Sequence, residues 1–309
     1  MSQEIELCRS EDSNDTTTTA GEKPNASPTT IIQQPFTKRQ INLILIGDVD
    51  SGKTAMLDLL ANVCAGVPLE DFKPVHKAAN ERDPSQPGSK TKVPELYTIS
   101  CANGTEVNIL DTPGLGDLRG SEIDVEHKIA IVKAIRCHFE TVDAIIILSF
   151  GGFYRLSLGV QFSLTTISSM FPHSITNNIA FVLTMVFDPT TIGFKRSYLP
   201  VELKDAKVWD INNPFPLWMK YQKRIAENPR TLPEEFLEDM NDTIRQDYPR
   251  TLTTLSEVFQ FLDKCEVQST ESAYRLNERP DVEASIPNVI AGTNQTESTR
   301  TNKLEEPLD

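Results

Sequence analysis

The sequence predicts a three-layer α/β fold, in which a mostly parallel sheet carries helices on both faces and a helical extension follows at the C-terminal side. Short apolar runs alternate with helix-period segments between residues 41 and 188. The first run, 41–46, leads directly into Gly47–Thr54, which reads G-x-x-x-x-G-K-T, and then into a helical segment. A strand, a glycine-rich loop and a helix in this order predict a phosphate-binding P-loop.

The remaining elements follow in chain order. Residues 96–100 and 106–110 are predicted to pair as a hairpin through an Asn103-Gly104 turn. We expect a helix over 124–140, a buried strand over 142–150, a helix over 157–171 and a buried strand over 179–184. Residues 214–264 are amphipathic and predicted to be helical, with breaks near Pro229, Pro233 and Pro249.

Composition divides the chain into four parts. Residues 1–37 and 266–309 are rich in Ser, Thr, Asn, Pro and acidic residues and are predicted to be disordered tails. Residues 38–200 form the predicted P-loop domain, and 201–265 the helical extension that packs on it or continues it. The net charge of −14 argues against nucleic-acid binding through phosphate neutralisation. With neither a membrane-length apolar run nor a signal-peptide core, a cytoplasmic protein is expected.

Each position of the P-loop has its own expected role. Glycine at positions 47 and 52 permits backbone angles and close approaches that a Cβ atom would prevent. Lys53 is expected to act in catalysis by placing its charge between the β- and γ-phosphates, and Thr54 to offer its hydroxyl to Mg²⁺. The nucleotide-binding set predicted here is the loop and the residue after it: Gly47, Asp48, Val49, Asp50, Ser51, Gly52, Lys53, Thr54 and Ala55.

A second motif follows the strand 106–110. Residues 111–114 read D-x-x-G, and an acidic residue at the carboxyl end of a strand beside the P-loop strand can reach Mg²⁺. The candidate groups are the carboxylate of Asp111, for the metal, and the amide of Gly114, for the γ-phosphate. With these motifs the sequence resembles the P-loop GTPases of the translation-factor class. Its D-T-P-G-L-G-D segment resembles the immunity-associated (avirulence-induced) GTPases, and more loosely the septins and chloroplast import GTPases.

The resemblance implies a Ras-like G domain that binds GTP or GDP with Mg²⁺. It also implies a switch threonine in the loop 66–95, where Ser89-Lys90-Thr91-Lys92 is similar to the family's S-x-T motif. Thr91 is therefore the candidate for a metal ligand with a catalytic role. A second switch is expected at Asp117 and residues 118–121. The partners implied are an unknown effector protein and a second copy of the chain across the nucleotide face, to which Arg119 or Arg155 could contribute.

Two departures from the family pattern affect the expected activity. Guanine recognition uses N/T-K-x-D, and a buried polar site of that kind rejects the wrong base by about 10⁴. If Thr184 opens this motif, its fourth position is Phe187; if Asp188 closes it, the lysine position is Val186. Asp188 is our candidate for guanine.

Leu115 is the second departure, because it stands where Ras-like enzymes carry the glutamine that orients the attacking water. Slow intrinsic hydrolysis is therefore expected. Two other hypotheses stay open: a nucleotide-dependent scaffold without hydrolysis, and an ATPase or small-molecule kinase.

Overall fold

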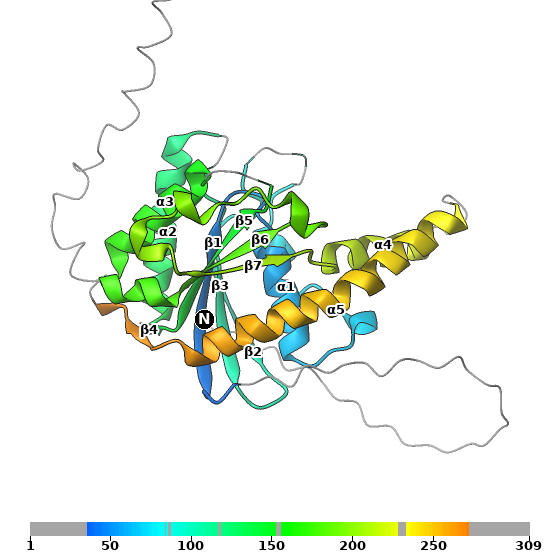
Figure 1. The fold of residues 1–309 in the computed structure, drawn as a ribbon, viewed down its shortest axis with the longest axis horizontal. Helices are drawn as coiled ribbons and strands as arrows, with labels where there is room; N and C mark the ends of the chain where they lie inside the picture. The colour runs from blue at the N-terminus through cyan, green and yellow to red at the C-terminus, as the bar shows by residue number, and fades with distance from the viewer. Residues whose placement is uncertain are drawn as a thin grey trace, which may run out of the picture.

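A six-stranded sheet forms the centre of the computed structural model, which describes residues 36–83, 85, 88–116, 119–152, 156–227 and 233–271. The strand order is β2-β3-β1-β5-β6-β7 (Figure 1). Strand β2 is antiparallel to β3, and the other pairs are parallel. The bounds are β1 (Gln40–Gly47), β2 (Glu95–Ser100), β3 (Glu106–Asp111), β5 (Ala144–Phe150), β6 (Ile179–Thr184) and β7 (Lys207–Ile211).

Helices cover both faces of this sheet (Figure 1). The helices are α1 (Lys53–Cys64), α2 (Ser121–His138), α3 (Leu158–Met170), α4 (Phe215–Glu227) and α5 (Glu234–Lys264). Alternate side chains of β1 enter two separate cores: Leu43 and Leu45 pack with α1, α4 and α5, whereas Ile44 and Ile46 pack with α2 and α3. The predicted three-layer fold with a C-terminal helix is therefore confirmed.

Six short 3₁₀ turns connect these elements in the described part of the chain: η1 (Leu69–Asp71), η2 (Ala78–Asn80), η3 (His173–Asn178), η4 (Pro189–Thr191), η5 (Arg196–Tyr198) and η6 (Val201–Leu203). A two-stranded sheet pairs β4 (Thr141–Val142) with β8 (Gln268–Ser269). Every helix in the described residues is too short or too polar to cross a membrane.

One strand lies where we expected helices. Strand β7 pairs with β6 at the edge of the main sheet, so residues 207–211 of the expected helical extension over 201–265 form a strand. Its sequence, K-V-W-D-I, buries only Ile211. An edge strand that fully buries one side chain carries a weak apolar signal in the sequence.

The expected break at Pro249 is also wrong. Helix α5 is 31 residues long and continues through Pro249 without a break. It starts directly after Pro233, where a break was predicted. A proline inside a helix costs about 3 kcal/mol, but packing on both sides of it holds the helix. Tyr248 contacts Phe72 edge-on with ring centroids 5.8 Å apart, and Leu252 is buried in the core. Pro229 lies outside the described residues.

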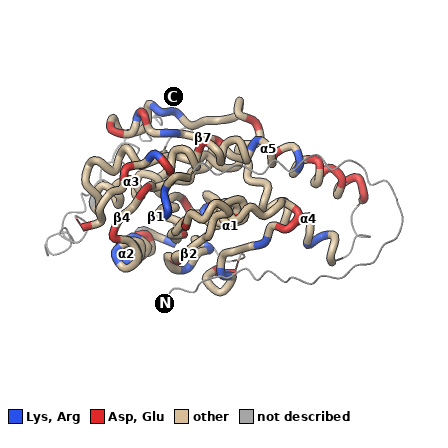
Figure 2. Tube along the Cα trace, turned by 90° about the horizontal axis from the view of Figure 1, so that it is seen from below, with Lys and Arg blue, Asp and Glu red and all other residues tan. Residues whose placement is uncertain are grey.

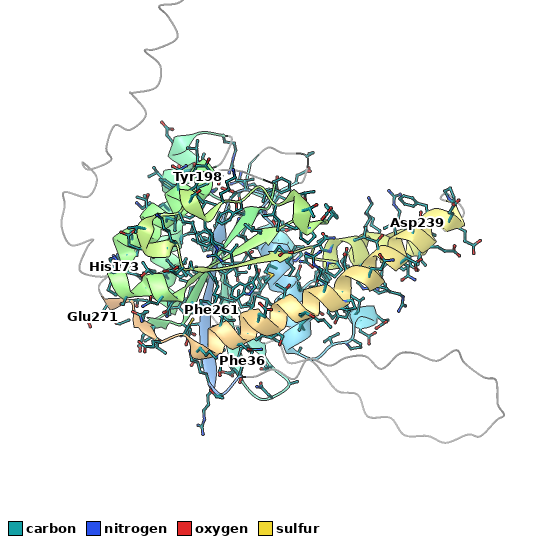
Figure 3. The ribbon with its side chains drawn as sticks, in the orientation of Figure 1. Phe36, His173, Tyr198, Asp239, Phe261 and Glu271 are labelled. Carbon is teal, nitrogen blue, oxygen red and sulfur yellow. The ribbon has the colours of Figure 1, made fainter. Side chains whose placement is uncertain are left out.

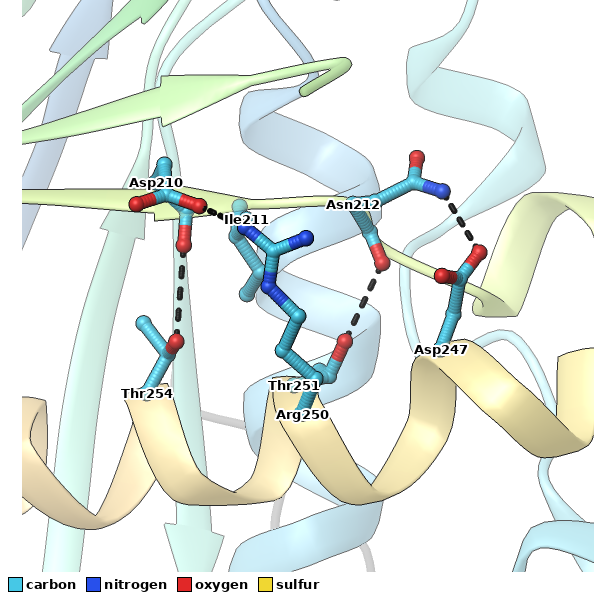
Figure 4. A pocket seen from close by; sticks show the side chains of 7 residues that line it. All are labelled: Asp210, Ile211, Asn212, Asp247, Arg250, Thr251 and Thr254. Carbon is cyan, nitrogen blue, oxygen red and sulfur yellow. Dashed lines mark hydrogen bonds and ion pairs between the residues drawn. The ribbon is translucent and has the colours of Figure 1, made fainter. Parts of the chain in front are cut away.

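Polar side chains attach α5 to β7 (Figure 4). Arg250 forms an ion pair with Asp210, and the hydroxyl of Thr251 donates to the carbonyl of Asn212 at 3.0 Å. The amide of Asn212 donates to Asp247 at 2.6 Å. These contacts fix the central part of α5 against the sheet edge.

The two ends of α5 differ in their surroundings. At its C-terminal half, which carries Phe259 and Phe261, Phe36 packs against Phe259 with ring centroids 5.2 Å apart (Figure 3). Its first turns extend past the sheet edge together with α4, with Asp239 near the tip (Figure 3). Acidic residues lie along this projecting part of α5 (Figure 2).

Candidate nucleotide site

The loop between β1 and α1 has the backbone geometry of a phosphate cradle. Gly47 and Gly52 have φ angles of 151° and 83°, and a Cβ atom on Gly47 would lie 2.1 Å from the carbonyl oxygen of Leu148 on β5. Asp50 takes a positive φ of 58° between them. The chain therefore turns sharply and directs the N-terminus of α1, with its partial positive charge, toward the loop.

Lys53 is held inside this loop. Its ammonium donates to the carbonyl of Asp48 at 2.6 Å and to that of Gly47 at 3.3 Å. Burial lowers the pKa of Lys53 to about 8, against the raising effect of nearby carboxylates, Asp111 foremost. A buried cation held next to backbone carbonyls can exchange them for phosphate oxygens.

The three residues predicted to hold Mg²⁺ come together at one corner of the site. The hydroxyl of Thr54 donates to Asp111 Oδ2 at 2.9 Å, and it lies 3.1 Å from the hydroxyl of Thr91. The second carboxylate oxygen of Asp111, Oδ1, is buried without a hydrogen-bond partner. Burial raises the pKa of Asp111 to about 6.

This donor set fits Mg²⁺. The ion prefers hard oxygen ligands and is held by one or two carboxylates together with hydroxyls, waters and phosphates. An unpaired, buried carboxylate oxygen is costly to the protein unless a cation or donor reaches it. Across the residues that the structure describes, His, Cys, Asp and Glu form no metal-binding group of three or more. Asp111, with its unpaired oxygen, would hold the ion together with Thr54 and Thr91.

Ser89 and Lys90, the two residues before Thr91 in the S-x-T-like segment, bring the loop 66–95 onto the site. The Ser89 hydroxyl accepts from the Gly114 amide at 2.8 Å and donates to the Thr91 carbonyl at 3.1 Å. Lys90 lies 3.4 Å from Asp50 in an exposed ion pair. Three consecutive residues thus contact three different parts of the site. Ser89 is the serine of the S-x-T-like segment, but its contact with Gly114 could be found only from the structure.

Replacing Ser89 with Ala is expected to lower the free energy of unfolding by about 1–3 kcal/mol, because it leaves the buried Gly114 amide without this acceptor. Urea unfolding of the full chain measures the change. Ser85→Ala is the matched control, since Ser85 lies in the same loop, is exposed and bonds Asp83 there. Equal stabilities of the two variants would contradict the inferred contact.

Two backbone hydrogen bonds join the D-x-x-G segment to the P-loop. The Leu115 amide donates to the Gly47 carbonyl at 3.0 Å, and the Val49 amide donates to the Leu115 carbonyl at 3.1 Å. A Cβ atom on Gly114 would lie 2.5 Å from the Cα of Val49, so only glycine allows this approach. The Val49 amide is thus engaged with Leu115.

The side chain of Leu115 is fully buried in the core on the α2–α3 side of the sheet. It therefore has neither the chemistry nor the position to orient a water molecule at the nucleotide. His127 of α2 contacts the residue before Leu115: its Nδ1 lies 3.0 Å from the Gly114 carbonyl oxygen. His127 was not expected at the site, because a lone histidine on a helix gives no sequence signal.

Asp48 connects the P-loop to α3. Its carboxylate accepts from the hydroxyl of Ser157 at 2.5 and 2.6 Å, and Ser157 also caps α3 by accepting from the Val160 amide. Burial raises the pKa of Asp48, and the Ser157 hydrogen bond opposes this effect. A Cβ atom on Gly159 would lie 2.2 Å from Asp48 Oδ1, which shows how closely α3 approaches.

The base-reading candidates lie at the end of β6. The hydroxyl of Thr184 donates to the Ser51 carbonyl at 3.0 Å, so this strand end contacts the P-loop. Asp188 is exposed, and its carboxylate accepts from the Thr190 amide at 2.8 Å, where it caps the turn η4. The Ala55 carbonyl accepts from Asn213 before α4 at 2.9 Å. Asp117, Leu118 and Arg155 lie outside the described residues.

Comparisons with known proteins identify no family. No protein-family model matches the chain, and no curated protein matches it. Toc33 from Arabidopsis thaliana in complex with GDP and Mg²⁺ is similar over 75% of this chain and 88% of its own, at 14% identity and a TM-score of 0.42.

Two other solved structures resemble the chain at a similar level. One is a variant of Era from Aquifex aeolicus bound to GDP·AlF4⁻. The match covers 64% of this chain and 58% of the Era chain, with 14% identity and a TM-score of 0.37. The other is the G domain of the T. maritima FeoB iron transporter. The match covers 68% of this chain and 99% of the FeoB chain, with 14% identity and a TM-score of 0.33. Similarity this low assigns neither a family nor a ligand to the chain.

Proposed function

We propose that the protein binds GTP and GDP together with Mg²⁺ and hydrolyses GTP slowly, as a nucleotide-dependent switch or assembly factor. The observation that carries this proposal is the convergence of Thr54, Thr91 and Asp111 at the mouth of the P-loop, beside the buried ammonium of Lys53. The choice of guanine rests on the D-T-P-G segment and its resemblance to the immunity-associated GTPases. The proposed place of action is the cytoplasm.

Each residue has a role in this proposal. Lys53 exchanges its loop carbonyls for phosphate oxygens, and the Gly114 amide exchanges the Ser89 hydroxyl for the γ-phosphate. Thr91, beside Thr54, holds the loop 66–95 against the metal and the phosphates. Mg²⁺, when bound, would neutralise charge that develops on the phosphoryl oxygens.

Leu115 supports the slow rate, because a buried leucine cannot orient the attacking water. The missing group would then come from a partner, such as an effector protein or a second copy of the chain across the nucleotide face. The same observation favours a second candidate function, a nucleotide-dependent scaffold that binds GTP without hydrolysing it.

Single-turnover hydrolysis separates the two candidates. We expect the wild-type protein to release phosphate from GTP slowly, and Lys53→Ala to release none, because the variant lacks the cation that holds the phosphates. Phosphate release is followed with protein in excess over GTP and Mg²⁺ present. GTP binding without any Lys53-dependent release would leave the scaffold as the function, whereas a preference for ATP in competition would refute the choice of guanine.

A further inference from the structure

The metal corner, formed by Thr54, Thr91 and Asp111, indicates the direction in which a bound nucleotide would lie. Asp111 ends β3, which pairs with β1 on one side, and Thr91 lies on the same side through its contact with Thr54. A terminal phosphate with its Mg²⁺ would therefore lie on the β3 side of the P-loop. Ligands of such sheets bind beyond the carboxyl ends of the strands, so the sugar and base extend over the ends of β5 and β6, on the other side of β1.

Apolar side chains stand at this end of the sheet. Met185, directly after β6, is 47% exposed, and Phe187 is 74% exposed. Val186 between them is buried, and a Cβ atom on Gly151 at the end of β5 would lie 2.4 Å from its side chain. The buried Val186 thus anchors the segment against β5 and leaves both neighbouring side chains at the surface.

The backbone at Met185 is unusual. Among the described residues, only Asp50 and Met185 are non-glycine residues with a positive φ, at 58° and 57°. Left-handed backbone at such residues costs free energy and concentrates at ligand sites. Asp50 lies in the P-loop, and Met185 follows the strand whose Thr184 bonds the P-loop. The two left-handed residues thus lie on either side of the contact between Thr184 and the P-loop in chain terms: Asp50 precedes Ser51, and Met185 follows Thr184.

Asp188 already has a structural role that explains its presence. Its exposed carboxylate bonds the Thr190 amide at the start of η4, the pattern of an ordinary Asp-Pro turn. The hydroxyl of Thr184 is likewise engaged with the Ser51 and Ser149 carbonyls. The described residues at the β6 end therefore offer a purine two apolar side chains and no buried carboxylate.

We infer that Met185 and Phe187 hold the purine base by contact with its ring face, and that the site consequently discriminates weakly between guanine and adenine. Every purine presents an aromatic face, so contact with it contributes affinity that tolerates a change of base. The methionine thioether also packs favourably on aromatic rings. Strong discrimination instead needs buried polar groups that are left unpaired by the wrong base. This inference rests on the proposed nucleotide binding and specifies its base subsite.

Dissociation constants for GTP, ATP and inorganic triphosphate, each with Mg²⁺, test the inference on the full chain. We expect GTP and ATP to bind the wild-type protein within about tenfold of each other. Phe187→Ala should weaken both by about tenfold and leave triphosphate binding unchanged. Asp188→Ala should leave the ratio of GTP to ATP affinity unchanged. Val267→Ala is the matched control, because Val267 is also exposed but precedes β8.

Two results would overturn the inference. One is a preference for GTP over ATP of about a thousandfold or more that Asp188→Ala removes, since this would assign the base contact to the carboxylate. The other is unchanged affinity of Phe187→Ala for both nucleotides. Failure of the proposed function itself looks different: inorganic triphosphate would then bind the wild-type protein no better than it binds Lys53→Ala.

Discussion

Asp111→Asn is expected to weaken Mg²⁺-dependent nucleotide binding by about 100-fold and, at the same time, to make the nucleotide-free protein more stable at pH 7. An asparagine of the same shape can still accept the hydrogen bond from Thr54, but it carries no charge for the metal. The gain in stability arises because the wild-type carboxylate is buried and one of its oxygens lacks a partner.

The sign of the stability effect follows from the pKa of Asp111. Burial raises this pKa from 3.8 to about 6 in the folded protein, so between these values the folded state binds a proton that the unfolded state releases. Stability therefore falls as the pH rises from 3.8 to about 6, by about 3 kcal/mol in total. Above pH 6 the loss is complete, and Asp111→Asn should avoid it.

Lys53 gives the corresponding effect on the alkaline side. Its pKa is lowered from 10.5 to about 8, so its contribution to stability is lowest below pH 8 and rises as the pH increases toward 10.5. Near neutral pH the nucleotide-free protein therefore contains two buried charges, each of which opposes folding. The phosphates would bring negative charge to Lys53, and Mg²⁺ would reach the unpaired oxygen of Asp111.

Urea unfolding between pH 4 and 9, without nucleotide, measures the prediction for Asp111→Asn, and titration with GTP at several Mg²⁺ concentrations measures the binding loss. Asp242→Asn is the control for removal of one negative charge, because Asp242 lies exposed on α5. A variant that binds GTP and Mg²⁺ as the wild-type protein does would exclude Asp111 from the metal corner.

Gly47→Ala is expected to lower the free energy of unfolding by about 3–5 kcal/mol. The added Cβ atom would lie 2.1 Å from the Leu148 carbonyl oxygen and 3.0 Å from its carbonyl carbon. Both atoms belong to the backbone of β5, paired with β1 at this position, so a side-chain movement cannot relieve the clash. The P-loop would have to separate from the sheet.

Gly104→Ala is the matched control for this clash. Gly104 also has a positive φ, 86°, but a Cβ atom there would find no other atom within 4 Å. Only the cost of a left-handed backbone, about 1–2 kcal/mol, is expected. Urea unfolding of both variants separates backbone strain from the steric clash, and equal losses of stability would contradict the close contact at Gly47.

The P-loop and the metal corner were predictable because their signals are local. Gly47–Thr54 lies between its strand and its helix, and Asp111 follows its own strand, so pattern and context coincide within a few residues. Thr91 needed the resemblance as well, since a threonine in a polar loop has no chemical signature.

The missed features depend on contacts between distant segments. Ser157 and Asp48 are 109 residues apart, and Ser89 and Gly114 are 25 apart. Neither pairing leaves a periodic or spacing signal. Strand β7 was missed because an edge strand buries few of its side chains. The break predicted at Pro249 was wrong because tertiary packing of α5 outweighs the local cost of a proline in a helix.

The hydrogen bonds between Leu115 and the P-loop also determine where a rearrangement of this region can start. Leu115 is bonded through both its amide and its carbonyl, and residues 48 and 115 form a parallel bridge. Rotating the backbone at Leu115 would break the cradle that holds the phosphates. Gly116, with a φ of 76°, is the first residue beyond these bonds. A rearrangement that keeps this cradle intact would therefore begin at Gly116, beyond the hydrogen bonds of Leu115.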